Sequence, residues 1–297
     1  MDFRIFWING TAGMGKTIIA HTISSTCKEC GILGASFFCL CDNADCSDPK
    51  LIFTTIAYQL RHLFPQFKDQ ITAVLRSNHE IGTSDLLYQL KELIVAPLCT
   101  LGDSFPSCVV VIDALDECKD DSTISMILAS LSMHIAELSP LKFLIISCPQ
   151  QCIMSGFTLE SLDLTTRHLV LHEVELGLMQ TDIKRYLTAH LDIACKSYNL
   201  PALWPSTTDI QALTTKSCGL FIFVVTSVQF IRDPNYSNPS NQFTRLLQNT
   251  APILESSSPY VCLNAFPNIS PSLARWLKII LSNIIFLQDA LSPLDLE

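Results

Sequence analysis

The residues of this sequence that most clearly indicate chemistry form the stretch GTAGMGKT. It fits the pattern GxxxxGK[ST], follows a strand-like run and opens a helix-like run. The glycines let successive backbone N–H groups curve around a β-phosphate, and the helix N-terminus adds partial positive charge. The Lys16 ammonium would reach the β- and γ-phosphates, and the Thr17 hydroxyl would coordinate Mg²⁺. The predicted nucleotide-binding residues are Gly10, Thr11, Ala12, Gly13, Met14, Gly15, Lys16 and Thr17.

A group of acids follows the most clearly apolar stretch, VVVIDALDE. Asp113 ends the apolar run, at the carboxyl edge of a buried strand, where nucleotide sites of open α/β sheets lie. We expect Asp113 and Thr17 to form the Mg²⁺ site, with Asp113 acting through water. Asp116 and Glu117 follow on the loop, where a carboxylate can orient or deprotonate the attacking water, so both are candidate catalytic residues.

The elements that must position these residues alternate between strand-like and helix-like patterns. Strands are expected at 3–9, 34–40, 108–117, 142–148 and 168–174. Helices are expected at 16–28, 49–64, 84–94 and 120–138. This alternation indicates an α/β fold with a parallel sheet flanked by helices and joined by right-handed crossovers.

Beyond about residue 177 the pattern becomes helical and the loops become polar. A short capped helix is expected at 182–191. The run GLFIFVVTSVQFI at 219–231 is ambiguous, because its composition favours a strand while its length favours a helix. We predict a helix there.

Composition and charge limit the classes of partner. The net charge is −9 and the Lys and Arg residues form no cluster, which argues against nucleic acid or an anionic membrane surface. No apolar run reaches the roughly 18 to 20 residues of a membrane-spanning helix, and the start has no signal-peptide pattern. We therefore expect a cytoplasmic chain. Hydrophobic residues make up 48% of it and charged residues 16%, so we expect protein partners or self-association besides the nucleotide.

The cysteines and histidines give weaker signals. Thirteen cysteines in a reducing compartment are mostly small buried hydrophobic residues. The alternative is a zinc site at Cys27 and Cys30, the CKEC stretch, which lacks a second pair at zinc-site spacing. The seven histidines show no HExxH or other metal-binding spacing.

The pair of motifs GTAGMGKT and VVVIDALDE resembles the NACHT branch of the STAND NTPases, which includes fungal NACHT proteins and NOD-like receptors. Further stretches are similar to this family, and together they cover most of the chain. They are FFCLCDNADCSDPKLIFTTIAYQL, KFLIISCP, GLFIFVVTSVQFI and IILSNIIFLQDALSPLDL.

The resemblance implies a signal-transducing switch that binds ATP or GTP with Mg²⁺ and holds ADP or GDP at rest. It implies a P-loop NTPase domain at 1–177 with strand order 5-1-4-3-2, a helical domain at 178–265 and the beginning of a winged-helix domain at 266–297. Since the family usually carries further domains, the chain is expected to be truncated.

One departure from the family bears on catalysis. The stretch SCPQ places Cys148 where the family usually has an arginine that touches the γ-phosphate. A thiol does not replace a charged planar guanidinium, so we expect firm nucleotide binding with slow or absent turnover. Arg167 is a conceivable substitute.

Two other functions stay open. A catalytically inactive, nucleotide-holding scaffold would fit the truncation, the apolar composition and Cys148. A metabolic kinase with the same P-loop would need lid arginines, which the helical region does not display.

Overall fold

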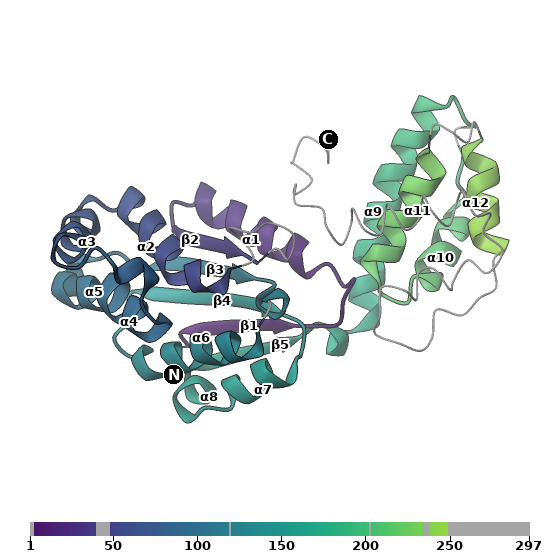
Figure 1. Ribbon diagram of the computed structural model, residues 1–297. Helices are drawn as coiled ribbons and strands as arrows, with labels where there is room; N and C mark the ends of the chain where they lie inside the picture. Colours follow the sequence, from purple (N-terminus) through teal and green to yellow (C-terminus); the bar gives the residue numbers. More distant parts are fainter. Residues whose placement is uncertain (1–2, 40–47, 119, 202, 234–237, 249–297) are drawn as a thin grey trace. The chain divides into compact units, whose positions relative to one another are not determined.

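The computed structural model describes residues 3–39, 48–118, 120–201, 203–233 and 238–248 (Figure 1). The chain divides into two compact units. The first contains the residues up to Gly10 and Lys16–Val170. The second contains the helices that follow Leu171, and the short segment Thr11–Gly15 groups with it. Residues 249–297, which include the expected winged-helix segment, lie outside the described residues.

The first unit is built on a five-stranded parallel sheet, as expected. Its strand order is β2-β3-β4-β1-β5, the order that the NACHT resemblance implies when read from the other edge (Figure 1). The strands are β1 (Ile5–Asn9), β2 (Leu33–Phe38), β3 (Cys108–Asp113), β4 (Leu141–Ser147) and β5 (Thr166–Val170). The expected strand at 168–174 is therefore displaced, since Leu171–Glu173 form a 3₁₀ turn.

Apolar residues of the central strands cover both faces of the sheet. In β3, Val110 and Ile112 belong to a core cluster with helices on one face, while Val111 points to the opposite face and is also fully buried. Helix α1 (Lys16–Glu29) packs against β2, β3 and β4. Because both faces of β3 are buried, its sequence is a continuous run of Val and Ile instead of the alternation of apolar and polar residues seen in half-exposed strands.

The remaining helices of the first unit include those expected at 49–64, 84–94 and 120–138, although their bounds differ, and three at 65–77, 151–157 and 160–165 that were not predicted. They are α2 (Ile52–Leu63), α3 (Pro65–Ser77), α4 (Leu86–Leu90), α5 (Ala96–Leu101), α6 (Asp121–His134), α7 (Gln151–Phe157) and α8 (Glu160–Thr165). The segment before α2 is a 3₁₀ turn, Pro49–Leu51. The helix expected at 84–94 is broken into α4, a π-helical turn at Lys91–Val95 and α5.

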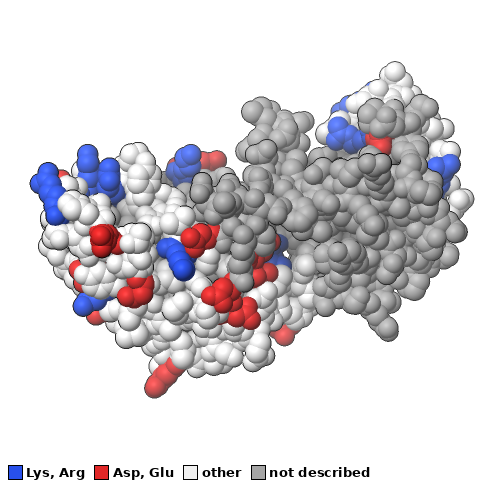
Figure 2. Space-filling model, in the orientation of Figure 1, with Lys and Arg blue, Asp and Glu red and all other residues white. Residues whose placement is uncertain are grey.

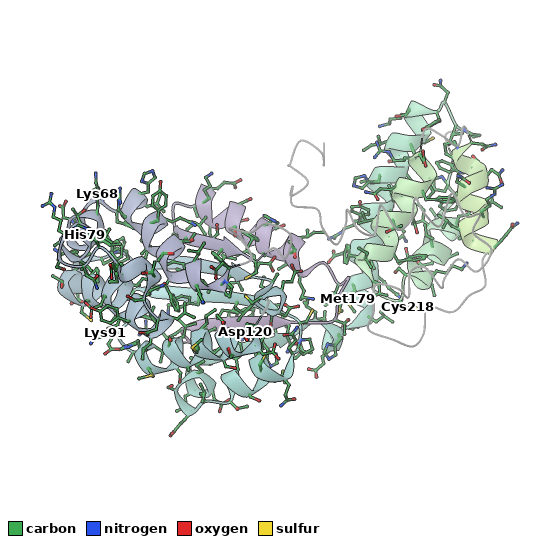
Figure 3. The ribbon with its side chains drawn as sticks, viewed as in Figure 1. Lys68, His79, Lys91, Asp120, Met179 and Cys218 are labelled. Atoms are coloured by element: carbon green, nitrogen blue, oxygen red, sulfur yellow. The ribbon has the colours of Figure 1, made fainter. Side chains whose placement is uncertain are left out.

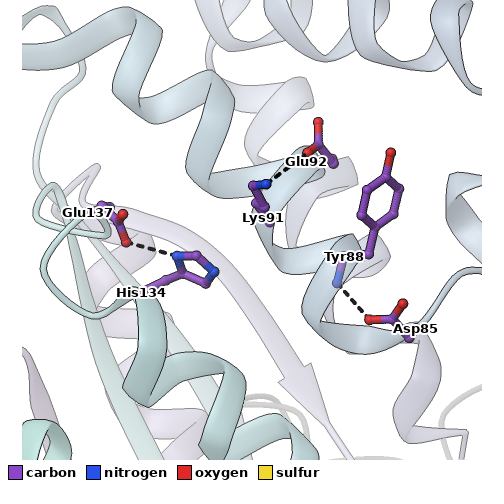
Figure 4. A network of polar contacts seen from close by, with 6 residues as sticks. All are labelled: Asp85, Tyr88, Lys91, Glu92, His134 and Glu137. Carbon is purple, nitrogen blue, oxygen red and sulfur yellow. Dashed lines mark hydrogen bonds and ion pairs between the residues drawn. The ribbon is translucent and has the colours of Figure 1, made fainter.

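Side-chain caps fix two helix starts that the sequence predicts only approximately. The helix expected from Ser84 begins at Leu86, because Asp85 is its N-cap and accepts a hydrogen bond of 2.9 Å from the Tyr88 backbone N–H (Figure 4). At the start of α6, the Asp120 carboxylate accepts a hydrogen bond of 3.0 Å from the Ser122 backbone N–H (Asp120 is labelled in Figure 3). Both acids satisfy backbone donors that the first turn of a helix leaves unpaired.

The second unit is helical. Its elements are α9 (Leu176–Ser197), α10 (Thr207–Lys216), α11 (Phe221–Arg232) and α12 (Pro239–Gln248). The ambiguous run at 219–231 is a helix, as predicted, because Val224, Val228 and Ile231 are buried against the other helices of this unit. The short helix expected at 182–191 is the middle of the longer α9.

Candidate functional site

The carboxyl ends of three neighbouring strands form the candidate site. Strands β3, β4 and β1 are adjacent and parallel, and they end at Asp113, Ser147 and Asn9. The register pairs Asn9 with Ser147, so Gly10 and Cys148 continue from matching positions. The strand order alone therefore brings the glycine stretch, the acids and Cys148 to one edge of the sheet.

Lys16, the first residue of α1, is held at this edge by two contacts. Its ammonium donates hydrogen bonds of 2.9 Å to the Gly10 carbonyl and 3.2 Å to Cys148 Sγ. The second contact joins the glycine stretch to the residue that follows β4. Cys148 thus lies beside the lysine that the sequence analysis expects to bind phosphate, as its place in the SCPQ stretch predicts.

The glycine stretch needs glycine at two positions for conformational reasons. Gly13 and Gly15 have φ values of +82° and +84°, in the left-handed region that other residues rarely adopt. Within the second unit, the Ile222 N–H donates a hydrogen bond of 3.1 Å to the Gly13 carbonyl. A Cβ atom added to Gly13 would lie only 2.5 Å from Ile222 Cγ2. Gly13 is therefore required both by its backbone conformation and by a close neighbour.

Asp113 is a buried carboxylate with unused hydrogen-bonding capacity. It is 2% exposed, and its Oδ1 has no hydrogen-bond partner among the described residues. Burial raises the pKa of Asp113 from 3.8 to about 6, while the Thr17 hydroxyl, the Ala114 backbone and the Lys16 charge act to lower it. The expected pair of Thr17 and Asp113 is thus brought together.

This pair fits the chemistry of Mg²⁺. The ion prefers oxygen ligands, keeps several of its own waters and often takes one or two carboxylates from a protein. A buried, unpartnered carboxylate oxygen next to a hydroxyl offers such ligands. A cation there would also offset the cost of the buried charge.

The two acids beyond Asp113 lie on a tight turn. Ala114 adopts a left-handed conformation with φ +55°, and Leu115–Glu117 then form a 3₁₀ turn. The fully buried Leu115 side chain anchors this turn in the core. The turn keeps Asp116 and Glu117 at the same sheet edge as Asp113.

Asp116 is used to join two loops. Its Oδ1 accepts a hydrogen bond of 2.7 Å from the Cys148 backbone N–H. Its backbone carbonyl accepts a hydrogen bond of 3.1 Å from Gln150 Nε2. The carboxylate therefore holds the loop after β4 against the loop after β3. Sequence reasoning places Asp116 with Glu117 as a catalytic candidate, and the geometry gives it a positioning contact that the sequence does not reveal.

The Cys148 thiol is a neutral group. Burial and, to a lesser extent, the Asp116 charge raise its pKa to about 11, while the Lys16 charge acts to lower it. At neutral pH the Lys16 ammonium therefore contacts a protonated thiol, which supplies no charge of either sign.

Asn9 is a site residue that the sequence reasoning missed. Its side chain is 2% exposed, its Oδ1 has no partner among the described residues, and its Nδ2 contacts Met154 Sδ at 3.9 Å. The available signal was a polar residue that ends an apolar strand directly before the glycine stretch.

Arg167 lies elsewhere on the sheet. It is exposed on β5 and pairs in register with Phe6, whereas Val170 pairs with Asn9 at the carboxyl end. The structure therefore gives no support to Arg167 as a substitute for the arginine that the NACHT resemblance implies at residue 148.

A family model supplies an independent comparison. The family described as nephrocystin 3, N-terminal, matches residues 2–148. The match runs from the strand before the glycine stretch to Cys148, so it includes Lys16, Asp113 and Asp116. No curated protein matches this chain.

Two further observations concern metals and membranes. The described residues contain no group of three or more His, Cys, Asp and Glu side chains that could hold a metal, so Cys27 and Cys30 gain no further ligand there. No helix within the described ranges is long and apolar enough to cross a bilayer. On the face drawn in Figure 2, acidic and basic side chains are scattered among uncharged ones.

Proposed function

We propose that the chain binds ATP or GTP with Mg²⁺ at the carboxyl edge of its sheet and works as a slow signal-transducing NTPase of the NACHT type. The observation that carries the proposal is the buried Asp113 carboxylate beside Thr17, whose Oδ1 has no hydrogen-bond partner among the described residues, with Lys16 at the start of α1. Burying an ionised carboxylate in this position costs free energy unless a cation binds it.

Each of these residues has a role in the proposed site. Lys16 would bind the β- and γ-phosphate oxygens, while Thr17 and Asp113 would hold Mg²⁺, which neutralises phosphate charge. Glu117 is the candidate to orient the attacking water or to accept its proton. Asp116 would keep the Cys148 backbone in place through their 2.7 Å hydrogen bond.

The expected rate is low because of the side chain at residue 148. A well-placed arginine in a nucleotide hydrolase contributes roughly 10³- to 10⁵-fold to turnover. The neutral thiol of Cys148 stabilises no negative charge on a transferring phosphate. This thiol also favours the second candidate function, a nucleotide-holding scaffold or interaction module without turnover.

Single-turnover phosphate release from Mg-ATP and Mg-GTP, with bound nucleotide quantified in the same samples, tests the proposal. We expect Lys16→Ala to lose nucleotide, and Glu117→Gln to keep nucleotide but lose release. Lys28→Ala and Glu29→Gln, both at the exposed end of α1, are the matched controls.

The outcomes separate the two candidate functions. Slow release that depends on Glu117 supports the switch, and tight binding without any release supports the scaffold. Nucleotide binding that survives Lys16→Ala, or its absence from the wild-type protein, would overturn the proposed site.

A further inference from the structure

Two cysteines that are far apart in the sequence lie in contact beside the candidate site. Cys39 follows β2 directly, and Cys118 follows the 3₁₀ turn that carries the acids. Cys118 Sγ lies 3.6 Å from Cys39 Sγ, although the residues are 79 positions apart. The side chains are 1% and 8% exposed for Cys39 and Cys118.

Backbone contacts tie both cysteines to the acids. The Cys39 N–H donates 3.0 Å to the Asp113 carbonyl, so the end of β2 is fixed to the end of β3. Cys118 directly follows Glu117, and its N–H donates to the Leu115 carbonyl across the turn. A bond between the two sulfur atoms would therefore connect the acid-bearing turn to the sheet.

We propose that Cys39 and Cys118 are a redox-sensitive pair that peroxide converts to a disulfide, and that this disulfide restrains the Leu115–Glu117 turn and lowers nucleotide turnover. The effect on turnover rests on the function proposed above. The formation of the disulfide and its effect on the turn do not depend on that function.

The chemistry requires one equivalent of a peroxide. The Cys118 thiol, the more exposed of the two, loses its proton and attacks hydrogen peroxide as its thiolate, and the O–O bond breaks to give a sulfenic acid and hydroxide. The hydroxide takes up the proton lost from the thiol and becomes water. The Cys39 sulfur then attacks the sulfenic sulfur, and the S–S bond forms as hydroxide leaves and takes up the thiol proton as water. Two electrons pass from the two thiols to peroxide, and the net products are one disulfide and two waters.

The order of the two steps follows from the environment of Cys39. Its side chain is 1% exposed, against 8% for Cys118, so peroxide reaches Cys39 less readily. Cys39 therefore reacts slowly with peroxide on its own. Once Cys118 is oxidised, contact between the sulfur atoms provides the proximity that drives closure.

The disulfide would move the turn. An S–S bond is about 2 Å long, so the sulfur atoms must approach each other from 3.6 Å. Cys39 is fixed to β3 by a backbone hydrogen bond, and Leu115 holds the start of the turn in the core. We therefore expect most of the displacement to fall on the end of the turn, at Glu117 and Cys118. A misplacement of about 1 Å near reacting groups can cost about a hundredfold in rate.

Peptide mapping and hydrogen exchange of the purified chain test the disulfide itself. After treatment with hydrogen peroxide, mass spectrometry should identify a peptide pair linked through Cys39 and Cys118. Hydrogen exchange at the amides of Leu115–Glu117 should slow, and dithiothreitol should reverse both changes. Oxidation of other cysteines without this link, or unchanged exchange in the linked protein, would overturn the proposal.

Turnover of oxidised and reduced protein tests the consequence for function. We expect oxidation to lower single-turnover phosphate release by up to about a hundredfold, and Cys118→Ser to abolish this sensitivity. Cys39→Ala gives a second variant with the same expected result, and Cys30→Ser, at an exposed cysteine, should respond like the wild type. Equal turnover of the linked and reduced proteins would overturn the regulatory role. Loss of turnover in both forms would instead overturn the proposed NTPase function, while the mapped disulfide would still support the redox pair.

Discussion

The substitution Asp113→Asn distinguishes the effect of the buried charge on stability from its proposed role in binding Mg²⁺. Burial raises the pKa of this carboxyl group from 3.8 to about 6, so ionising it in the folded chain costs about 3 kcal/mol more than in the unfolded chain. Asn has nearly the same shape and no charge. At pH 7, without metal or nucleotide, we expect the free energy of unfolding of Asp113→Asn to exceed that of the wild type by up to about 3 kcal/mol.

The pH dependence has a defined sign. A carboxyl group whose folded pKa is raised favours the folded state at low pH, and this stabilisation is lost as the pH rises from about 4 to about 6. The difference between variant and wild type should therefore be largest at pH 7 and close to zero near pH 4.

Urea denaturation at pH 4, 5, 6 and 7 in the presence of a chelator measures this difference. Asp103→Asn removes an exposed charge and controls for the change in net charge. Repeating the series with Mg-ATP at about a hundred times its dissociation constant should stabilise the wild type by about 2.7 kcal/mol and the variant by much less. A variant that is no more stable than the wild type at pH 7 would show that burial of the Asp113 charge does not destabilise the folded chain. A variant that gains the full ligand stabilisation would refute the role of Asp113 in metal binding.

Two further substitutions address the glycine stretch and Cys148. Gly13→Ala should destabilise the chain by about 1 to 3 kcal/mol in urea denaturation because of its φ of +82° and its contact with Ile222, whereas Gly82→Ala, which meets no atom within 4 Å, should not. Equal effects of the two substitutions would contradict this. Cys148→Arg should raise single-turnover phosphate release by at least roughly tenfold, since a guanidinium beside Lys16 can stabilise phosphate charge. Cys148→Ser is its control, and an unchanged rate for the arginine variant would show that the thiol is not what limits turnover.

The strands of the sheet were predictable because they depend on local patterns, whereas their order came only from the resemblance to the NACHT branch, since it depends on pairing between segments far apart in the sequence. A continuous Val and Ile run that ends in Asp113 predicts a buried strand, and β3 has that form. The π-helical turn at Lys91–Val95, in the helix that follows Asp85, was not predictable from the spacing of apolar residues. Such a turn adds one residue but keeps the apolar side chains on nearly the same face. The early end of β5 has no sequence signal either, since Leu171 is as apolar as the strand before it.

Within the candidate site, the residues that belong to a motif were predictable and the contacts between loops were not. Lys16, Thr17 and Asp113 belong to patterns with a defined spacing, and the structure brings them together. The hydrogen bond between Asp116 and the Cys148 N–H joins loops 32 residues apart, and a sequence gives no measure of such proximity. The contact between Cys39 and Cys118 has the same origin, since only the neighbouring positions of β2 and β3 create it.

The backbone N–H of residue 148 donates the hydrogen bond to Asp116. The path of the backbone at this position therefore does not depend on which side chain it carries. Any residue other than proline supplies the same N–H, so the loop after β4 can keep its path whatever side chain it carries. The side chain beside Lys16 can therefore change from charged to neutral without rebuilding the backbone around it. Under the proposed function, one substitution at residue 148 could therefore change the rate of hydrolysis while the backbone that holds the nucleotide stays in place.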